Sequence, residues 1–443
     1  MKPICVVAPI FWALSISSFG QTEVMTAHRL SSDPAADSMT MEEVVAEVLQ
    51  SNPEIQTAVR RLSLAQLKTN TARDLEDPML MVRDWDTPIQ KPWDLNQAQL
   101  MVSVQQSFLG KDKRDLRAKV AVDDAEVAAS DLESLRQEIA AEARKACADL
   151  MRNADEMQLH NRQAAVLKEA LAAALAQYTT GKVPQADVLR AQIAVTRLNE
   201  HLLELEQERD DTIAQLNALL GRRPDGAVEI AGAYSIPAAL PPIEDLEQVA
   251  IENRPELEGL RKQILKSKDE GKLTRLAMKP DFTVGLGYML MPTGATYRNA
   301  YMAEMTMNIP SLNHERHEGE AKQADAATAV SQAELDARTS AVFLEIRRAQ
   351  IDVLAAQKRI KLYRDTLMPQ AEAAFKASAA AYQNNRGDFS NLIDSQNMLL
   401  DVQTAFYKAS AATDTGIAAL ERAIGAPLST VPKMNSAREK GSK

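Results

Sequence analysis

The sequence predicts a mainly α-helical chain with a small β part, in which long antiparallel coiled-coil helices dominate. Three observations predict this fold class. The stretch from Lys111 to Tyr178 lacks proline and glycine and is rich in strong helix formers. The stretch after it has a 3.5-residue apolar period, and four short segments alternate apolar and polar residues. Aromatic residues make up only 4% of the chain, which favours long helices over a compact α/β enzyme.

The predicted long helices exceed the needs of a compact domain. At 1.5 Å per residue, a helix over 111–178 would be roughly 100 Å long. The next helix, at about 185–220, carries a heptad register that predicts supercoiled packing against neighbouring helices, with Arg209 and Thr212 as exceptions. Its two apolar positions are occupied by Val188, Val195, Leu202 and Leu216, and by Ala191, Leu198, Leu205 and Leu219.

An internal repeat divides the chain into two halves with one order of elements. Asn52-Pro53-Glu54-Ile55 recurs as Asn253-Arg254-Pro255-Glu256-Leu257, and Tyr178 recurs as Tyr382. We expect each half to contain a helix, with Thr40 as the first cap, then two strands and two long helices. The predicted segments are repeats at 40–221 and 243–425, second-half long helices at about 318–382 and 391–424, a linker at 222–242 and a disordered tail at 426–443.

The first residues resemble a secretory signal peptide at 1–20. Lys2 precedes an apolar run from Ile4 to Ile16, and small residues follow near Gly20. Removal of this segment would leave Cys147 as a lone thiol, which excludes an internal disulfide framework. Beyond it, no apolar run approaches the roughly 20 residues that a membrane helix needs. An exported chain that enters a membrane would therefore do so as β-strands.

Four segments have the period of β-strands, at about 79–86, 98–105, 281–291 and 300–309. In the third, Phe282, Val284 and Leu286 alternate with polar residues and glycine. This alternation is typical of transmembrane barrel strands, but a soluble antiparallel sheet gives the same pattern. Four strands cannot close a barrel, because the smallest spanning barrels have about eight. Strands in a membrane would therefore require a shared barrel, and three chains would supply twelve.

Several function classes are excluded. The net charge of -10 argues against a nucleic-acid-binding protein, which normally has a basic face. No phosphate-binding glycine loop, nucleophile elbow or reactive cysteine motif is present. The sequence therefore predicts that the chain is not an enzyme and has no cofactor.

The order of motifs, present in both halves, resembles the TolC-like outer-membrane efflux protein family over nearly the whole mature chain. The resemblance rests on the Asn52-Pro53-Glu54 start, the turns at 178–189 and 382–396, and the Leu-Leu-Gly and Ile-Gly helix ends. Gly110-Lys-Asp-Lys-Arg114 and Asn308-Ile-Pro-Ser-Leu312 are most similar to the heavy-metal branch of CusC- and CzcC-like channels.

The resemblance implies a homotrimer whose shared 12-stranded transmembrane β-barrel lies in outer-membrane lipid of a Gram-negative cell. It also implies a trimeric α-barrel tunnel in the periplasm. A periplasmic adaptor (membrane fusion) protein and an inner-membrane pump, for which the RND type is one candidate, would complete a tripartite efflux system. Such a channel passively conducts its substrates, here metal ions or small toxic compounds, and is gated at the periplasmic helix tips.

The resemblance also indicates candidate gate residues at the two turns that join the long helices. Asp394 matches an acidic position that rings the constriction in relatives, whereas Asn391 replaces a second one. Asp187 and Arg190 hold the equivalent positions in the first half, and we hypothesise a contact between Arg190 and Asp394. The alternative for Asp394 is a solvated helix residue. The remaining tip residues are Gly181, Gly387 and Arg386, of which the glycines serve turn geometry.

No metal site is predicted, although weak candidates exist. Met289, with Met291 two residues on, falls on the polar set of its strand, whereas Met305 and Met307 fall on the apolar set. Thioethers suit Cu(I), but methionine is also adaptable apolar filler, and we favour filler. His314 and His317, at i and i+3, fit a solvated helix start better than a metal site.

Two other functions stay open. The first is a periplasmic or secreted coiled-coil scaffold whose strands form small soluble hairpins. The second is an outer-membrane channel that serves protein secretion rather than efflux. Membrane fractionation separates the scaffold from both channels, and only the partners separate the two channels.

Overall fold

The computed structural model describes residues 39–85, 89–90, 99–234, 239–384 and 386–431. All of them belong to one compact unit, Ser38–Lys443, and the other unit, Met1–Asp37, is not described. The predicted signal peptide, Ala98 of the second predicted strand and residues 432–443 of the predicted tail lie outside the described residues.

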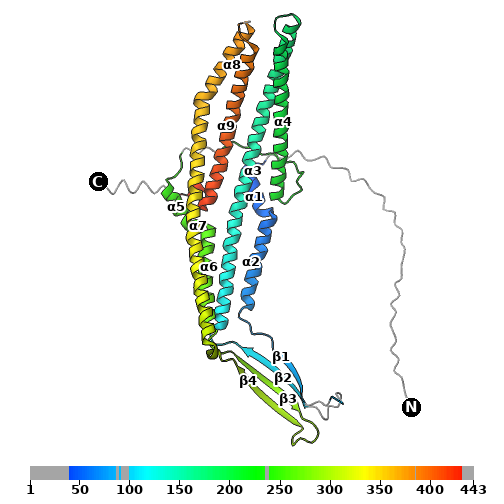
Figure 1. Cartoon of the computed structure of the whole chain (residues 1–443), viewed down its shortest axis with the longest axis vertical. Coiled ribbons are helices and arrows are strands. Elements are labelled where there is room, and N and C mark those ends of the chain that lie inside the picture. The colour runs from blue at the N-terminus through cyan, green and yellow to red at the C-terminus, as the bar shows by residue number, and fades with distance from the viewer. Residues whose placement is uncertain (1–38, 86–88, 91–98, 235–238, 385, 432–443) are drawn as a thin grey trace, which may run out of the picture. The chain divides into compact units, whose positions relative to one another are not determined.

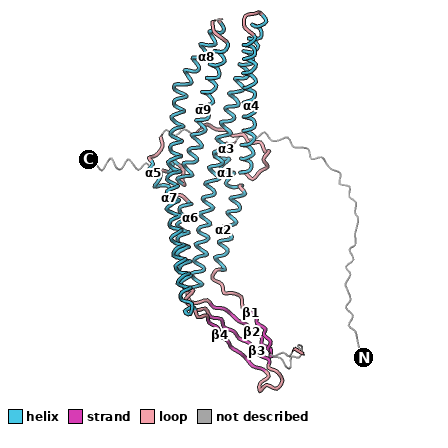
Figure 2. Tube along the Cα trace, viewed as in Figure 1, coloured by secondary structure: helices cyan, strands magenta, loops and turns pink. Residues whose placement is uncertain are grey.

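The first repeat contains two short helices, two strands and two long helices (Figures 1 and 2). We predicted one initial helix, but Pro53 cannot donate the backbone hydrogen bond that would continue it, so a second helix begins there. Thr40 caps the first helix as predicted, in a reciprocal capping box with Glu43. The elements are α1 (Met41–Ser51), α2 (Pro53–Thr71), β1 (Met79–Trp85), β2 (Gln99–Phe108), α3 (Lys113–Thr179) and α4 (Gln185–Leu219).

The second repeat has the same order of elements. Its elements are α5 (Ile243–Asn253), α6 (Pro255–Leu276), β3 (Phe282–Leu290), β4 (Asn299–Met307), the 3-10 helix η1 (Pro310–Asn313), α7 (His314–Leu362), the π-helical turn η2 (Tyr363–Leu367), α8 (Met368–Gln383), α9 (Phe389–Ile424) and the 3-10 helix η3 (Leu428–Thr430).

The helix predicted over about 318–382 is interrupted. The π-helical turn at Tyr363–Leu367 precedes Pro369, which stands in the first turn of α8. Proline lacks an N–H and its ring collides with the carbonyl four residues earlier, and a π-helical turn relieves both problems by widening the helix locally. The sequence prediction overlooked this proline. By contrast, α3 runs for 67 residues without interruption, as predicted.

Each repeat buries its own core at the middle of the long helices. In the first, α1 contributes Val44 and Val48, which pack against α3 and against Leu216 of α4. Cys147 of α3 lies in this cluster with no exposed surface, and burial raises the pKa of its thiol to about 12. No helix among the described residues combines the length and the apolar character needed to cross a membrane.

The core of the second repeat includes residues that we had assigned to a disordered tail. Leu246 of α5, Ile346 of α7 and Leu420 of α9 form its centre. Val431 is buried in the same cluster, and Leu428 packs against it. The prediction of disorder is therefore wrong for residues 426–431, because these apolar side chains cover the end of α9.

The strands form one antiparallel sheet in the order β1-β2-β3-β4 (Figure 2). The predicted strands differ from the observed ones by one to three residues at their ends. One face is apolar and exposed, with Leu80, Leu286 and Tyr301 at 68%, 67% and 92% exposure. Within the described residues, β1 pairs only with β2 and β4 only with β3, so neither edge of the sheet has a partner strand there.

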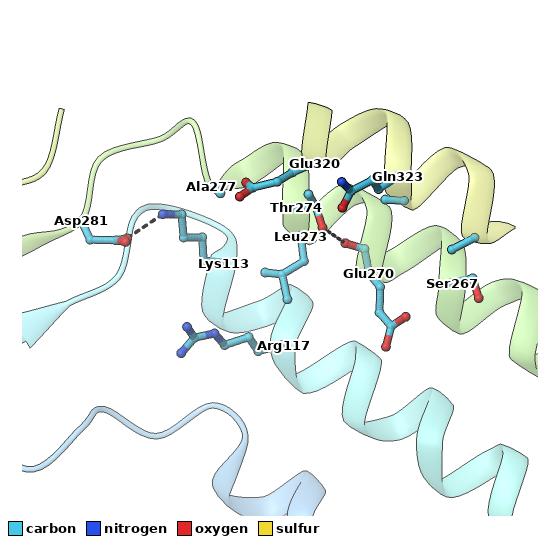
Figure 3. Close-up of a pocket in the computed structure, with 12 residues that line it drawn as sticks. Lys113, Arg117, Ser267, Glu270, Leu273, Thr274, Ala277, Asp281, Glu320 and Gln323 are labelled. Carbon is cyan, nitrogen blue, oxygen red and sulfur yellow. Dashed lines mark hydrogen bonds and ion pairs between the residues drawn. The ribbon is translucent and has the colours of Figure 1, made fainter. Parts of the chain in front are cut away.

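The sheet is tied to the helices by an ion pair between a buried lysine and a partly exposed aspartate. Lys113 Nζ at the start of α3 lies 2.8 Å from Asp281 Oδ1, which also accepts the Gly110 N–H. Burial alone would raise the pKa of Asp281, but these two hydrogen bonds outweigh it and hold the pKa below its usual range. Figure 3 shows the pair at the edge of a cavity of about 710 Å³ between α3, α6 and α7.

Candidate gate at the helix tips

The first tip is the turn between α3 and α4, and it depends on a left-handed glycine. Gly181 has φ 71° and donates its N–H to Tyr178 O at 2.9 Å. No atom would contact a Cβ at this position, so the backbone angle rather than space requires glycine. Gln177 O at the end of α3 accepts both the Lys182 N–H and the Thr180 hydroxyl, each at 2.9 Å, which closes the end of the helix.

The second tip, between α8 and α9, uses its glycine differently. A Cβ on Gly387 would lie 2.9 Å from Ala381 Cβ, so close packing against the end of α8 requires glycine there. The neighbouring Arg386 donates its N–H to Ala381 O at 2.8 Å and leaves its side chain exposed. The predicted role of both glycines in turn geometry thus has two different physical causes.

An apolar cluster joins the two tips below the turns. Phe389, 1% exposed, meets the Tyr382 ring edge-on, with 5.4 Å between ring centroids. Its neighbours include Val188 and Ala191 of the predicted heptad positions. Tyr382 Oη also lies 3.4 Å from Gln177 Oε1 of the first tip. Sequence reasoning missed Phe389, although a lone aromatic residue after Gly387-Asp388 was the available signal.

Asp187 lies at the boundary between this cluster and solvent. Burial raises the pKa of the Tyr382 hydroxyl, and the Asp187 carboxylate raises it further because a phenolate would face a like charge. Arg190, one turn along α4, lies 3.7 Å from Asp187. Asp187 also stands in the first turn of α4, where the helix dipole favours a negative charge.

Asp394 and Arg190 line one groove without touching. The groove, about 460 Å³ in volume, runs between α4 and α9. It contains two arginines from α4, Arg190 and Arg197, and two aspartates from α9, Asp394 and Asp401, each pair seven residues apart. Such spacing places both members of a pair on one helix face. Within the described part of one chain, no ion pair joins Arg190 to Asp394. The Asn391 side chain is exposed on α9, one turn before Asp394.

The weak metal candidates do not converge. His317 Nδ1 lies 3.1 Å from Glu320 of its own helix, and His314 stands one turn earlier. Across the described residues, no three His, Cys, Asp or Glu side chains are arranged to hold a metal ion. Met289 lies on β3. Met291 follows the end of this strand, and the Met291 N–H donates to Arg298 O.

Comparison with known proteins identifies the family. A family model described as "Outer membrane efflux protein" matches residues 84–222 and 246–426, in both repeats. The chain belongs to the outer membrane efflux protein family. The family is one of channels rather than enzymes, and it places the chain in the outer membrane of a Gram-negative cell, extending into the periplasm.

This outer membrane efflux protein is similar to one curated protein in sequence and to several solved structures in fold. The cobalt-zinc-cadmium resistance protein CzcC of Cupriavidus metallidurans is 22% identical over 393 residues, covering 88% of this chain and 91% of that protein. The outer-membrane channel OprN matches with a TM-score of 0.75 at 18% identity, covering 88% and 90% of the two chains. The outer membrane protein VceC of Vibrio cholerae matches with a TM-score of 0.73 at 18% identity, covering 88% and 96%.

Proposed function

We propose that three copies of this chain form one outer-membrane channel that passively conducts efflux substrates. The open sheet supports the proposal most directly. An open sheet edge cannot lie in lipid, because its free N–H and C=O groups find no partner there. Pairing β4 of one copy with β1 of the next would satisfy both edges and close a barrel of twelve strands, with the exposed apolar face toward lipid.

The helices would extend this channel into the periplasm as a tunnel. The apolar positions of α4 and α9 at the tips pack against α3 and α8 within one chain. The groove between α4 and α9 is lined in part by Leu167, Leu198 and Ile393 of the same apolar cluster. We infer that a periplasmic adaptor protein docks at the helical part and that an inner-membrane pump, such as one of the RND type, supplies the energy.

The gate would lie at the tips, where the groove carries opposite charges on α4 and α9. Approach of α9 toward α4 of the same or a neighbouring copy would bring Asp394 to Arg190 and hold the tip closed. Reversal of the charge with Arg190→Glu should raise the resting conductance in planar bilayers. Arg209→Glu is the matched control, because Arg209 is exposed on α4 outside the groove. A resting conductance unchanged by Arg190→Glu would contradict this gate.

Metal cations are the cargo that the comparisons favour, since the relative CzcC is named for cobalt, zinc and cadmium resistance. Deletion of the gene should sensitise cells to transition-metal salts more than to antibiotics. Equal sensitisation to both would favour a general channel.

The native mass of the mature chain, extracted with detergent from an outer-membrane fraction, tests the proposal. A particle of three chains that conducts ions in a planar bilayer is the expected result. A monomer or dimer, or a chain found in the soluble fraction, would overturn the channel and favour the coiled-coil scaffold.

A further inference from the structure

The sheet has two chemically different faces, and methionine occurs on both. Directly paired residues in an antiparallel sheet share a face, so the strand register assigns every side chain. Leu80, Val104 and Leu286 form one row of the exposed apolar face, which also carries Met305 and Met307. The opposite face carries Gln105 and Glu304, which are joined by a hydrogen bond. This opposite face would line the interior of a closed barrel.

Five methionines lie on that interior face, from all four strands. They are Met79, Met81, Met101, Met289 and Met302. Methionine chosen only as lipid-facing apolar filler would be expected on the other face. Here thioethers stand instead among amides, a carboxylate and the Arg83 guanidinium.

The interior methionines are placed within reach of one another. Met101 and Met289 are direct cross-strand partners, which puts their Cβ atoms about 4.5–5.5 Å apart. Met302 pairs with Gly287, two residues before Met289, and is therefore a diagonal neighbour of Met289. Gly287 has no side chain, and a Cβ there would lie 2.8 Å from Ser103 Cβ, so close packing of Ser103 requires glycine at this position.

Two of the interior methionine sulfur atoms accept hydrogen bonds from polar side chains. Gln99 Nε2 lies 3.0 Å from Met289 Sδ, and Arg83 Nη2 lies 3.3 Å from Met81 Sδ. These contacts point sulfur lone pairs into the polar face rather than into an apolar core. Thioethers are soft, neutral donors that select Cu(I) over the harder divalent cations.

We propose that this methionine face is a set of weak binding points for soft monovalent cations of the Cu(I) class. The inference rests on the proposed function, because only closure of the barrel makes the face a channel lining. Three copies would present fifteen thioethers, and several weak sites suit conduction, since a cation must leave as readily as it enters. The Glu304 carboxylates would raise the local cation concentration beside them.

The test compares methionines on the two faces of one sheet. The full mature chain in detergent is titrated calorimetrically with Ag(I), a stable soft monovalent cation, in chloride-free buffer. Met101→Leu with Met289→Leu removes two interior thioethers and conserves volume, whereas Met305→Leu with Met307→Leu is the matched control on the apolar face. We expect the interior variant to weaken Ag(I) binding at least about tenfold and the control to change it less than about twofold.

A second readout identifies the ligand and guards against misfolding. X-ray absorption of the silver-loaded wild type should show sulfur in the coordination shell, and the interior variant, which keeps Met79, Met81 and Met302, should show fewer sulfur ligands per bound silver. If the double variant does not assemble, Met289→Leu alone, at a partly exposed position, serves instead. Equal Ag(I) binding by the interior variant and the control, or wild-type binding no tighter to Ag(I) than to Zn(II), would overturn the inference and leave the methionines as apolar filler.

Native mass separates this inference from the proposed function. A three-chain conducting particle that fails the Ag(I) test overturns the methionine sites alone. A wild type that never forms a three-chain particle overturns the channel itself, and with it the lining.

Discussion

The two repeats use different side chains to join the start of their second short helix to the end of their last helix, a contact that we call the junction. In the first, Asn52 caps α2 and donates through Nδ2 to Leu219 O at the end of α4, at 2.9 Å. In the second, Arg254 occupies the position before the proline and donates through Nη1 to Ala423 O near the end of α9, at 3.0 Å. Each therefore ties a proline-headed short helix to the end of the last helix in its repeat.

The second junction differs from the first because it also contains ion pairs. Arg254 is 2% exposed and pairs with Glu256 at 3.0 Å and Glu345 at 2.7 Å. Arg338 pairs with the same two carboxylates. A neutral amide completes the first junction alone, whereas a buried cation requires a network of carboxylates. The repeats can thus share a backbone and still differ in their sensitivity to mutation and acid.

The largest expected effect is that of Arg254→Ala. It leaves Glu256 and Glu345 sharing a single guanidinium and leaves the Ala423 carbonyl unpaired, so the free energy of unfolding should fall by about 3–5 kcal/mol. Urea denaturation of the detergent-solubilised protein measures the change. Arg136→Ala is the control, because the exposed Arg136–Glu133 pair should contribute at most about 1 kcal/mol. Equal losses in the two variants would remove the distinction between the repeats.

A smaller effect is expected from Asn52→Ala, about 1–2 kcal/mol, because it removes a helix cap and one bond to Leu219 without leaving a buried charge. Asn52→Asp separates the two contributions, because a carboxylate keeps the cap acceptor and loses the Nδ2 donor to Leu219 O. The same denaturation series measures both. A loss for Asn52→Ala as large as that for Arg254→Ala would mean that the ion network adds nothing.

Stability lost on replacing the two tip glycines, Gly181 and Gly387, with alanine should be restored by different substitutions. Gly181→Ala forces a left-handed alanine and should cost about 1 kcal/mol, which Gly181→Asn should partly recover because asparagine tolerates this angle. Gly387→Ala instead collides with Ala381, so Ala381→Gly should recover it and Gly387→Asn should not. Hydrogen exchange of the tip amides measures the local loss. Rescue of both positions by asparagine would show that one cause applies to both turns.

The smallest effect is expected from acid, and of the two junctions only that of the second repeat should respond. Burial raises the pKa of Glu256, but hydrogen bonds and charge from Arg338 and Arg254 lower it more, so the net pKa lies below its ordinary value. The stabilisation is complete above the unfolded pKa of about 4.3 and is lost as pH falls through the lower folded value. Hydrogen exchange, corrected for intrinsic rates, should increase in α6 before α2 below about pH 4. Loosening of α2 first would contradict this order.

Features that depend on neighbours in sequence were predictable. The absence of proline and glycine from 111–178 predicted α3 to within two residues, and period-2 alternation located all four strands. The Thr40 cap followed from Glu43 three residues later. Each of these signals acts within one or two turns of the chain, which is the range over which backbone propensities operate.

Features that depend on distant side chains were not predictable. The repeat matched Asn52 to Asn253 and gave Arg254 no role, because the partners of Arg254, Glu345 and Ala423, lie 91 and 169 residues away. The Tyr382–Phe389 contact is local, but its link to Gln177 spans 205 residues. At the gate, the order of motifs indicated Asp394 and Arg190, whereas the groove that they share with Arg197 and Asp401 required the packing of α4 against α9.

The burial of Cys147 protects its thiol from the oxidising environment of the periplasm. The periplasm promotes disulfide formation, and a lone surface thiol there would cross-link one channel to another or capture small thiols. The Cys147 thiol has no exposed surface, and a pKa of about 12 leaves almost none of it as the reactive thiolate at neutral pH. If Cys5 is removed with the predicted signal peptide, the mature protein needs no cysteine removed before a reporter thiol is introduced at either tip, where labelling rates could follow opening in the intact channel.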